Sequence, residues 1–330
     1  MLSITYFYRE PRKTGVSIEG IFKLVRECLK DKADITEFYC DKDLSRFKNT
    51  LAAGKHSGKI NHITGDVNFL AIALRGKKNI LTIHDLGHYE TLKNRNYLHF
   101  FIYKLFWYSL PLKNIDVVTV VSQFTKNKLK EYFNFPEEKI KVIYDPVKPL
   151  FKYTPKEKPG EKPVILMMGT GRHKNLGNLI EAARNSNYHV DIIGWPAPDE
   201  LERLNSYGIS HTVYNRLTDE EVYARYRACD ILYNASFYEG FGMPVIEAQS
   251  VGRAVITSNV GAMKEVAGNS AVMVDPHKPD QIRAAIDRLV SDKVFYDGMV
   301  ALGRENVIPF DYRHIAEQYL QVYLEIEKKA

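Results

Sequence analysis

The chain has 330 residues, of which 45% are hydrophobic and 26% charged, an ordinary globular composition with enough length for two domains. Its three cysteines show no CxxC spacing, which excludes a zinc knuckle and a disulfide framework and favours a reducing compartment. No apolar run is long enough to span a bilayer, and the N-terminus lacks the segments of a signal peptide, so we expect a cytoplasmic location.

The basic charge is concentrated in the first half. Residues 1–150 contain 25 Lys and Arg and 16 Asp and Glu, which gives a net charge of +9. The remaining residues contain 21 Lys and Arg and 24 Asp and Glu, which gives a net charge of −3. Two interpretations are open. The first half is attracted to an anionic acceptor or to the inner face of the cytoplasmic membrane, or it is merely a solvated basic surface.

Short apolar runs alternate with helical periodicity in the first half, which predicts a parallel sheet. The expected strands are residues 1–7, 35–40, 60–64, 79–83 and 115–121. No GxGxxG occurs in the chain, which disfavours a nicotinamide dehydrogenase.

Polar residues at strand ends are the first site candidates, because ligands gather at the carboxyl ends of parallel strands. Gly15 lies in the turn RKTG between a strand and a helix, where a simple helix start is the alternative. His84 ends the strand 79–83, where it could meet a substrate, and Asp85 would orient its ring or hold the turn. Residues 62–66 are interpreted as a plain turn, and a segment that lines the acceptor side is the alternative.

Residues 96–112 carry seven aromatic side chains at helical spacing on more than one face, with basic residues at both ends. We interpret this segment as a core helix. The alternative is an interfacial helix that contacts a membrane.

Residues 146–162 are rich in Pro and Lys and are interpreted as a linker. After the next strand, 164–168, the loop GTGRHKN leads into a helix, so Arg172 and Lys174 lie at a helix N-terminus. The helix dipole disfavours a cation there by about 0.3–1 kcal/mol, and a bound anion such as phosphate would reverse the sign. An exposed basic loop is the alternative.

The stretch 229–274 has the order strand, loop, helix and strand of a nucleotide-binding sheet. Gly240 and Gly242 let the main chain approach a ligand, and the first amides of the helix at Pro244 favour an anion. Glu239 and Glu247 suit sugar hydroxyls, which a carboxylate accepts in pairs. The pattern therefore predicts a nucleotide-sugar ligand, and two solvated glutamates beside an ordinary turn are the alternative.

The string YEGFGMPVIEA, in which Glu239 and Glu247 form an E-x7-E motif, resembles the family-four retaining glycosyltransferases with the GT-B fold. The following SNVGAMKEVAGNSAVMVDP is similar to the segment that closes the donor site in that family. The resemblance is tight over roughly 160–285 and diffuse over 1–145.

The resemblance implies an α/β protein with two Rossmann-like, doubly wound parallel-sheet domains facing across a cleft. The acceptor-side domain is expected at 1–145 with a C-terminal helix near 310–330. The linker is expected at 146–162, and the donor-binding domain at 163–309.

Site roles follow from the same resemblance. Lys174, helped by Arg172, holds the donor diphosphate, and Gly15 lies beneath it. The amides of Phe241, Gly242 and Met243 stabilise the departing charge. Glu247 holds the ribose, Glu239 and His84 contact the transferred sugar, and the turn at Arg216 meets the base. Asp145-Pro146 replaces the Asn-Gly more usual in the family, which weakens any ligand role at that junction.

The implied activity is transfer of a hexose, with retention, from a nucleotide-diphosphate sugar to a saccharide or lipid-linked saccharide in cell-surface polysaccharide synthesis, such as that of lipopolysaccharide. GDP-mannose is the expected donor, and neither a metal nor another cofactor is expected. Peripheral contact with an anionic membrane is an expected partnership, and nucleic acid binding is not. The alternatives are a non-hydrolysing nucleotide-sugar epimerase and a non-catalytic sugar-nucleotide-binding subunit.

Overall fold

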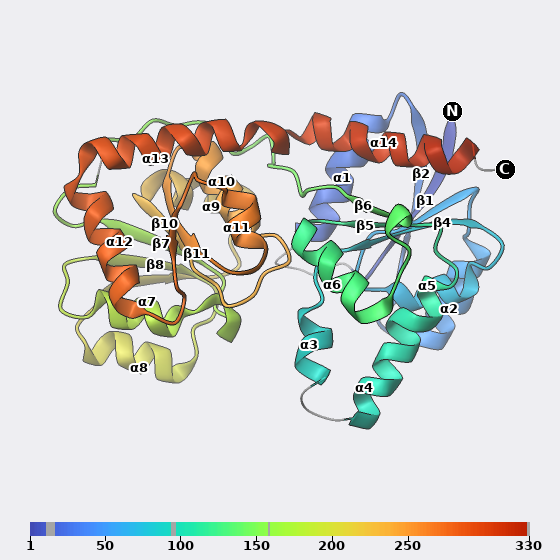
Figure 1. The fold of residues 1–330 in the computed structure, drawn as a ribbon, viewed down its shortest axis with the longest axis horizontal. Coiled ribbons are helices and arrows are strands. Elements are labelled where there is room, and N and C mark those ends of the chain that lie inside the picture. The colour runs from blue at the N-terminus through green and yellow to red at the C-terminus, as the bar shows by residue number, and fades with distance from the viewer. Residues whose placement is uncertain (11–16, 94–96, 158, 329–330) are drawn as a thin grey trace. The chain divides into compact units, whose positions relative to one another are not determined.

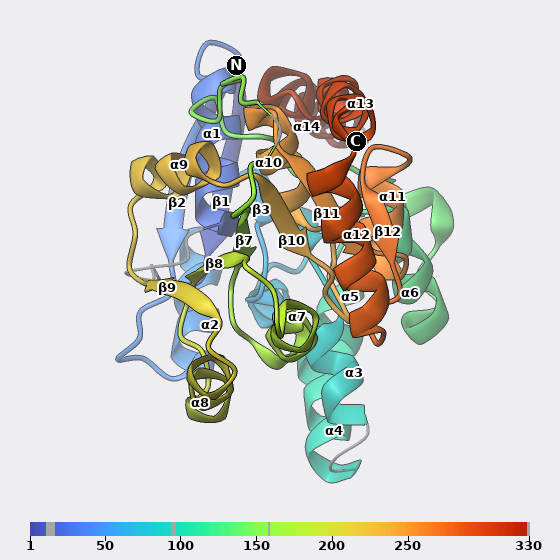
Figure 2. The ribbon, with the colours of Figure 1, turned by 90° about the vertical axis from the view of Figure 1, so that its left-hand side faces the viewer.

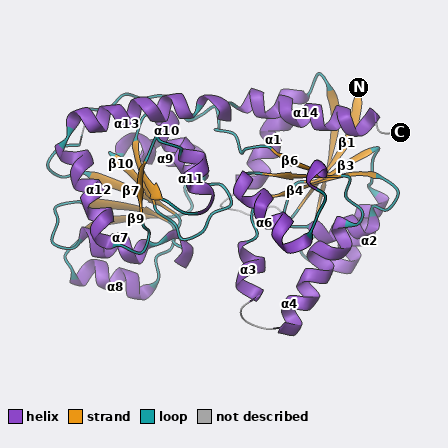
Figure 3. Ribbon diagram, in the orientation of Figure 1, coloured by secondary structure: helices purple, strands orange, loops and turns teal. Residues whose placement is uncertain are grey.

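The computed structural model describes residues 1–10, 17–93, 97–157 and 159–328 (Figure 1). The chain divides into two compact units, Met1–Pro146 with Tyr312–Ala330, and Val147–Asp311. Each unit is built on its own parallel sheet with helices packed around it (Figure 3). The chain passes between the units twice, at Pro146–Val147 and at Asp311–Tyr312. These two passages lie side by side, because Val147 and Asp311 form a parallel β-bridge.

The first unit has six parallel strands in the order β2-β1-β3-β4-β5-β6. They are β1 (Leu2–Tyr8), β2 (Ala33–Tyr39), β3 (Ile60–Ile63), β4 (Lys78–Ile83), β5 (Val117–Val120) and β6 (Ile140–Val142). Ile4 of β1 pairs with Ile35 on one side and with Ile60 on the other. The strand order therefore reverses at β1, which makes the gap between β1 and β3 a switch point of the sheet.

Helices cover both faces of this sheet. They are α1 (Ser17–Leu29), α2 (Arg46–Lys55), α3 (Gly87–Lys93), α4 (Tyr97–Tyr103), α5 (Leu110–Leu112), α6 (Gln123–Phe133) and α14 (Tyr312–Lys328). The short turns are η1 (Asn68–Ala73), the π-helical η2 (Lys104–Ser109) and η3 (Glu137–Lys139). Ser122 caps α6 by accepting a hydrogen bond from the Thr125 amide.

One face of the first sheet is apolar, and the other carries a buried polar network. Phe7, Ile63 and Leu81 pack with α2 and α6 on the apolar face. On the opposite face, the hydroxyl of Tyr323 from α14 lies 2.8 Å from Nδ1 of His62 and 2.9 Å from the hydroxyl of Tyr6. Residues from both ends of the chain are thereby joined in one core.

The turn predicted at residues 62–66 starts later than expected. His62 is the third residue of β3 and is fully buried, with Nε2 2.7 Å from the Thr82 hydroxyl. Burial lowers the pKa of His62 to about 3, so the ring is neutral at physiological pH. Within this segment, Gly65 and Asp66 have positive φ.

The prediction of one core helix over residues 96–112 is wrong in part. The chain forms α4, η2 and α5 in succession, and none of the residues of α4 is buried. Phe100, Tyr103 and Trp107 pack against the core of the unit, whereas large apolar side chains on the outer face are exposed. A segment that is apolar all round does not show from sequence which face is covered.

The second unit has six parallel strands in the order β12-β11-β10-β7-β8-β9, and Figure 2 shows β7 between β10 and β8. They are β7 (Val164–Met168), β8 (His189–Ile193), β9 (Ser210–Tyr214), β10 (Ile231–Asn234), β11 (Ala254–Ser258) and β12 (Val272–Val274). The order reverses between β7 and β10, and ligands of such sheets bind outside the strand ends at that point.

The helices of the second unit are α7 (Leu176–Ala183), α8 (Pro198–Ser206), α9 (Asp219–Ala228), α10 (Met243–Val251), α11 (Gly261–Ala267), α12 (Pro279–Ser291) and α13 (Lys293–Asn306). Two single turns, η4 (Arg172–Lys174) and η5 (Ile308–Phe310), complete it. A capping box opens α9, with Thr218 and Glu221 each hydrogen-bonded to the main chain of the other. Pro244 lies in the first turn of α10, as its missing N–H favours.

Candidate active site

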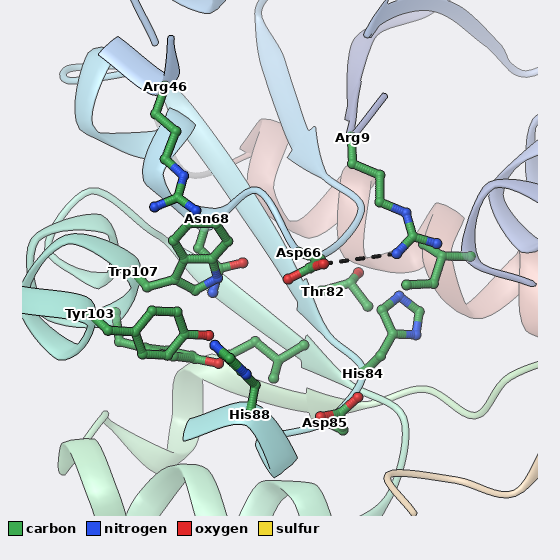
Figure 4. Close-up of a pocket in the computed structure, with 13 residues that line it drawn as sticks. Arg9, Arg46, Asp66, Asn68, Thr82, His84, Asp85, His88, Tyr103 and Trp107 are labelled. Carbon is green, nitrogen blue, oxygen red and sulfur yellow. Dashed lines mark ion pairs between the residues drawn. The ribbon is translucent and has the colours of Figure 1, made fainter. Parts of the chain in front are cut away.

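A cavity of about 490 Å³ opens at the carboxyl ends of β1, β3 and β4 in the first unit (Figure 4). It is lined by Arg9, Ile18, Arg46, Asp66, Asn68, Thr82, Ile83, His84, Asp85, His88, Tyr103, Trp107 and Tyr108. The lining mixes cations, carboxylates and aromatic rings, the side chains that bind the hydroxyls and the apolar faces of sugars. The predicted strand-end residue His84 is part of it.

His84 is held from both sides of its ring. Nε2 lies 2.9 Å from the Thr64 carbonyl oxygen, and Nδ1 lies 3.7 Å from the Asp145 carboxylate. Burial alone would lower the pKa of His84, but the Asp145 carboxylate, the Thr64 carbonyl and Asp85 together outweigh burial and raise it. A protonated ring donates through Nε2 to the Thr64 carbonyl and carries a positive charge that the Asp145 carboxylate attracts, so this geometry favours the cation.

The carboxylate that orients His84 is therefore Asp145 and not Asp85. Asp85 is exposed and accepts a hydrogen bond from the Gly87 amide at 2.8 Å, which fixes the start of α3. Asp145 is 5% exposed, and it is the residue at which the sequence departs from the family's usual Asn-Gly. The departure thus supplies a buried negative charge beside the candidate histidine.

Replacing this charge should be visible in the titration of His84. In Asp145→Asn, burial is opposed by fewer interactions, so the pKa of His84 should fall, whereas Asp85→Asn should lower it much less. Because the pKa of His84 is higher in the folded than in the unfolded chain, the protonated ring stabilises the fold fully at pH values below 6.5, the ordinary histidine pKa. This stabilisation is lost as the pH rises through the pKa of the folded state. NMR titration of the His84 ring protons measures both variants; an equal fall in Asp85→Asn would contradict the assignment.

The turn after β3 is part of the same cavity. Asp66 has a positive φ of 53°, and a Cβ on the preceding Gly65 would lie 2.8 Å from the His84 ring. Asp66 is 3.8 Å from the Arg9 guanidinium (Figure 4). The same guanidinium also forms an ion pair with Glu19 at 2.6 Å. The interpretation as a plain turn did not place this segment at a cavity, because Gly-Asp also suits an ordinary turn. The left-handed conformation of Asp66 at the cavity makes it a candidate site residue.

In the second unit, the structure brings together Lys174 and Glu239, which the sequence placed 65 residues apart. Lys174 Nζ donates to Glu239 Oε1, which also accepts from the Ser236 hydroxyl at 3.0 Å. Gly169 leaves room for the lysine, since a Cβ there would lie 3.3 Å from Lys174 Cε. The pair sits where the loops after β7 and β10 meet, at the switch point of the sheet.

Asn175 fixes these loops relative to each other. Its buried side-chain amide donates to the carbonyls of Ala235 at 2.9 Å and Pro276 at 2.7 Å. Tyr233 donates to the Asn175 carbonyl at 3.2 Å. The two neighbouring residues therefore have different roles, because Asn175 holds three segments together and Lys174 carries the charge.

Glu247 is 7% exposed and accepts a hydrogen bond from the Tyr226 hydroxyl at 2.8 Å. Burial raises the pKa of the Glu247 carboxyl, and the Tyr226 hydrogen bond and the charges of Lys148 and Lys174 oppose this only in part. Both motif glutamates are thus partnered in the structure, which argues against two solvated glutamates beside an ordinary turn.

The loop that leads into α10 has a left-handed glycine and an unpaired donor. Gly242, the N-cap of α10, has a φ of 103°, which other residues rarely adopt. Beside it, the buried side-chain amide nitrogen of Asn234 has no hydrogen-bond partner within the described part of the chain. Phe241 packs its ring on Phe310 at 5.7 Å, so only its main chain is placed for a ligand. Gly240 and Met243 flank the same turn.

Two matches to family models decide the family. The model described as "Glycosyl transferases group 1" matches residues 152–305, and that described as "Glycosyltransferase Family 4" matches residues 60–149. The sucrose-phosphate synthase of Thermosynechococcus elongatus superposes with a TM-score of 0.80 at 17% identity, over 100% of both chains. The chain belongs to the glycosyltransferases with the GT-B fold.

Two Escherichia coli proteins are similar in sequence. The serotype-specific mannosyltransferase WbdA is 26% identical over 268 residues, 72% of this chain and 32% of WbdA. The O-antigen chain mannosyltransferase B is 26% identical over 235 residues, 64% of this chain and 61% of that protein. The match thus spans about a third of the first relative and three fifths of the second.

The remaining predicted residues of this GT-B glycosyltransferase are less closely grouped. Arg172 lines a cavity of about 340 Å³ with Asn175 and Phe237, a lining that includes neither Lys174 nor Glu239. Arg216 is exposed and left-handed, with its guanidinium 5.8 Å from the ring of Trp195. Gly15 lies outside the described residues.

Sequence reasoning missed Trp195, a 64% exposed aromatic at the carboxyl end of β8 of the glycosyltransferase. Its amide donates to the Thr170 hydroxyl at 2.8 Å, which ties the ends of β7 and β8 together. The preceding Gly194 has a φ of 144°, and a Cβ there would lie 2.8 Å from the Thr170 hydroxyl. The signal that could have found it is the Gly-Trp step directly after a buried strand.

The raised pKa of Glu247 gives the glycosyltransferase a testable pH dependence. Because the pKa of Glu247 is higher in the folded than in the unfolded chain, the protonated carboxyl stabilises the fold at pH values below 4.5, its ordinary pKa. This stabilisation is lost as the pH rises through the pKa of the folded state. Glu247→Gln is always neutral, so its free energy of unfolding relative to wild type should rise between pH 4 and pH 8. The rise should be about 1.4 kcal/mol per unit of pKa shift. Chemical denaturation measures it, and an equal difference at both pH values would contradict the assignment.

Proposed function

We propose that this chain is a retaining glycosyltransferase that moves a hexose from a nucleoside-diphosphate sugar to a hydroxyl of a saccharide acceptor. The carrying observation is the Lys174–Glu239 pair at the switch point of the second sheet, beside the N-terminus of α10. A cation, a helix N-terminus and an unpaired amide at Asn234 suit a diphosphate, and the carboxylates suit hydroxyls.

In the proposed reaction the bond between the anomeric carbon and the diphosphate breaks, and a bond from that carbon to the acceptor oxygen forms on the same face. The acceptor proton passes to a donor phosphate oxygen. Lys174, with Arg172 and the amides of Phe241–Met243, stabilises the charge that develops on the leaving diphosphate. No metal is required, because cationic side chains and the helix dipole neutralise that charge.

The carboxylates have separate roles in this proposal. Glu239 exchanges Lys174 for hydroxyls of the donor sugar, and Glu247 accepts the ribose hydroxyls alongside Tyr226. His84, whose pKa is raised by the Asp145 carboxylate, contacts the transferred sugar, and the cavity around it takes the acceptor. The exposed ring of Trp195 is available for stacking a nucleobase.

GDP-mannose is the proposed donor, and a cell-surface polysaccharide the proposed product. The support is the two Escherichia coli relatives, whose names assign them to mannosyl transfer and, for one, to the O-antigen chain.

A thermal-shift screen of the chain against GDP, UDP and ADP tests the donor assignment, with guanosine and GMP as controls. A ligand at 100 times its dissociation constant adds about 2.7 kcal/mol of stability. GDP should raise the melting temperature most, and guanosine least. No stabilisation by any nucleoside diphosphate would contradict the proposed function, and formation of an epimer from a sugar nucleotide without acceptor would favour the epimerase.

A further inference from the structure

The cavity of about 340 Å³ in the second unit lies between the first turns of α7 and α8. Its lining contains neither Lys174 nor either glutamate of the E-x7-E motif. Figures 1 and 2 both show α7 and α8 on one side of the second sheet, and α9 and α10, which carry Tyr226 and Glu247, on the other. The groups assigned to the donor, Arg172 apart, therefore leave this cavity without a function.

Part of the lining forms a fixed frame. Asn178 donates a hydrogen bond to a main-chain carbonyl of another loop at 2.8 Å. Glu200 accepts from the Ala197 amide at 2.9 Å, and Arg203 donates to the Glu181 carboxylate at 2.6 Å. The walls of the cavity are thus held in place before a ligand enters, which lowers the entropic cost of binding.

Three other side chains of the lining have binding capacity left. Arg172 and Asp199 form no hydrogen bond or ion pair with any residue that the structure describes, and they are not paired with each other. The side chain of Phe237 is 36% exposed, and the ring of His277 stacks on it at 4.7 Å. A free guanidinium, a free carboxylate and an oriented aromatic ring therefore surround one space.

The charges of the lining argue against an anionic ligand. Asp199 and Glu200 lie in the first turn of α8 and neutralise its positive end. The Arg203 charge is matched by Glu181, which leaves Arg172 as the cation of the described lining without a carboxylate. A neutral ligand rich in hydroxyls fits better, because hydroxyls donate to a carboxylate and accept from a guanidinium while C–H groups pack on an aromatic ring.

We propose that this cavity is a saccharide-binding subsite of the second unit, separate from the donor site. The ring of Phe237 packs on the apolar face of a sugar, and Asp199 accepts hydrogen bonds from its hydroxyls. Arg172, which the proposed function also assigns to the diphosphate, lies in the loop that the two sites share. Saccharide binding stands on the cavity alone, whereas the identity of the saccharide as a unit of the acceptor or product chain rests on the proposed function.

Isothermal titration calorimetry of the full chain with mannotetraose and with maltotetraose tests the subsite. We expect one of these tetrasaccharides to bind, and Asp199→Asn to weaken that binding about tenfold, since it removes a hydrogen bond to a charged group. Phe237→Ala should weaken it to a similar extent. Glu202→Gln, which makes the same change of charge at an exposed position of α8 outside the lining, is the matched control and should bind as wild type does.

Titration with GDP separates the subsite from the donor site. Saturating GDP should leave the saccharide bound, and Asp199→Asn should keep the thermal stabilisation that GDP gives the wild type. Wild type that GDP does not stabilise would sink the proposed function and leave the subsite standing. No binding of either tetrasaccharide, or equal binding by Asp199→Asn and wild type, overturns the subsite. Displacement of the saccharide by GDP would assign the binding to the donor site and overturns it as well.

Discussion

Glu239→Gln is expected to lower turnover of the sugar nucleotide by about two to three orders of magnitude, the usual cost of removing one preorganised electrostatic contact to the transition state. The amide keeps the shape of the side chain and its contact with Ser236, so the loop should stay folded. Binding of the nucleoside diphosphate should be unchanged or severalfold tighter, because Lys174 is freed from its carboxylate partner.

Steady-state kinetics together with calorimetric titration of GDP distinguish these effects. The matched control is Glu202→Gln, an exposed carboxylate on α8, which should behave as wild type. Undiminished turnover in Glu239→Gln would remove this residue from the mechanism, and a parallel loss of GDP affinity would show that it acts on folding or on the diphosphate instead.

Lys174→Ala should weaken GDP binding by about 10- to 100-fold, the range for a lost hydrogen bond between charged groups. Guanosine binding should change little, because the lysine acts on phosphate alone. Lys278→Ala, which removes a lysine whose side chain is 62% exposed, is the control. Equal losses for GDP and guanosine would contradict the phosphate role.

The pair can be separated by a double-mutant cycle. In Lys174→Ala the Glu239 carboxylate loses its cation and repels the incoming diphosphate, so part of the lost affinity is repulsion. Lys174→Ala/Glu239→Gln should therefore bind GDP more tightly than Lys174→Ala alone. Strict additivity of the two effects would mean that the ion pair has no influence on the donor.

Local patterns were sufficient to predict much of the fold. The predicted strand at 164–168 coincides with β7, and the predicted strands at 60–64 and 79–83 lie within one residue of β3 and β4. The loop between β10 and α10 was also predicted, because strand, glycine and Pro244 lie within a few residues of each other. Such signals are local, and a sequence displays them directly.

Partners distant in sequence could not be predicted in the same way. Asp145 reaches His84 across 61 residues, and Tyr226 reaches Glu247 from another helix. From the sequence, Asp85 could either orient the adjacent histidine or hold the turn. Its carboxylate accepts a hydrogen bond from the main chain of α3, which is the second of these roles. Only the strand order shows which strand ends are neighbours, and this order depends on packing of the whole sheet.

The most direct test of the central claim is a crystal structure of the chain with GDP bound. The account predicts the diphosphate within hydrogen-bonding distance of Lys174 Nζ and the amides of residues 241–243, with the ribose hydroxyls on the Glu247 carboxylate. A nucleotide bound elsewhere, with Lys174 still paired to Glu239, would contradict it.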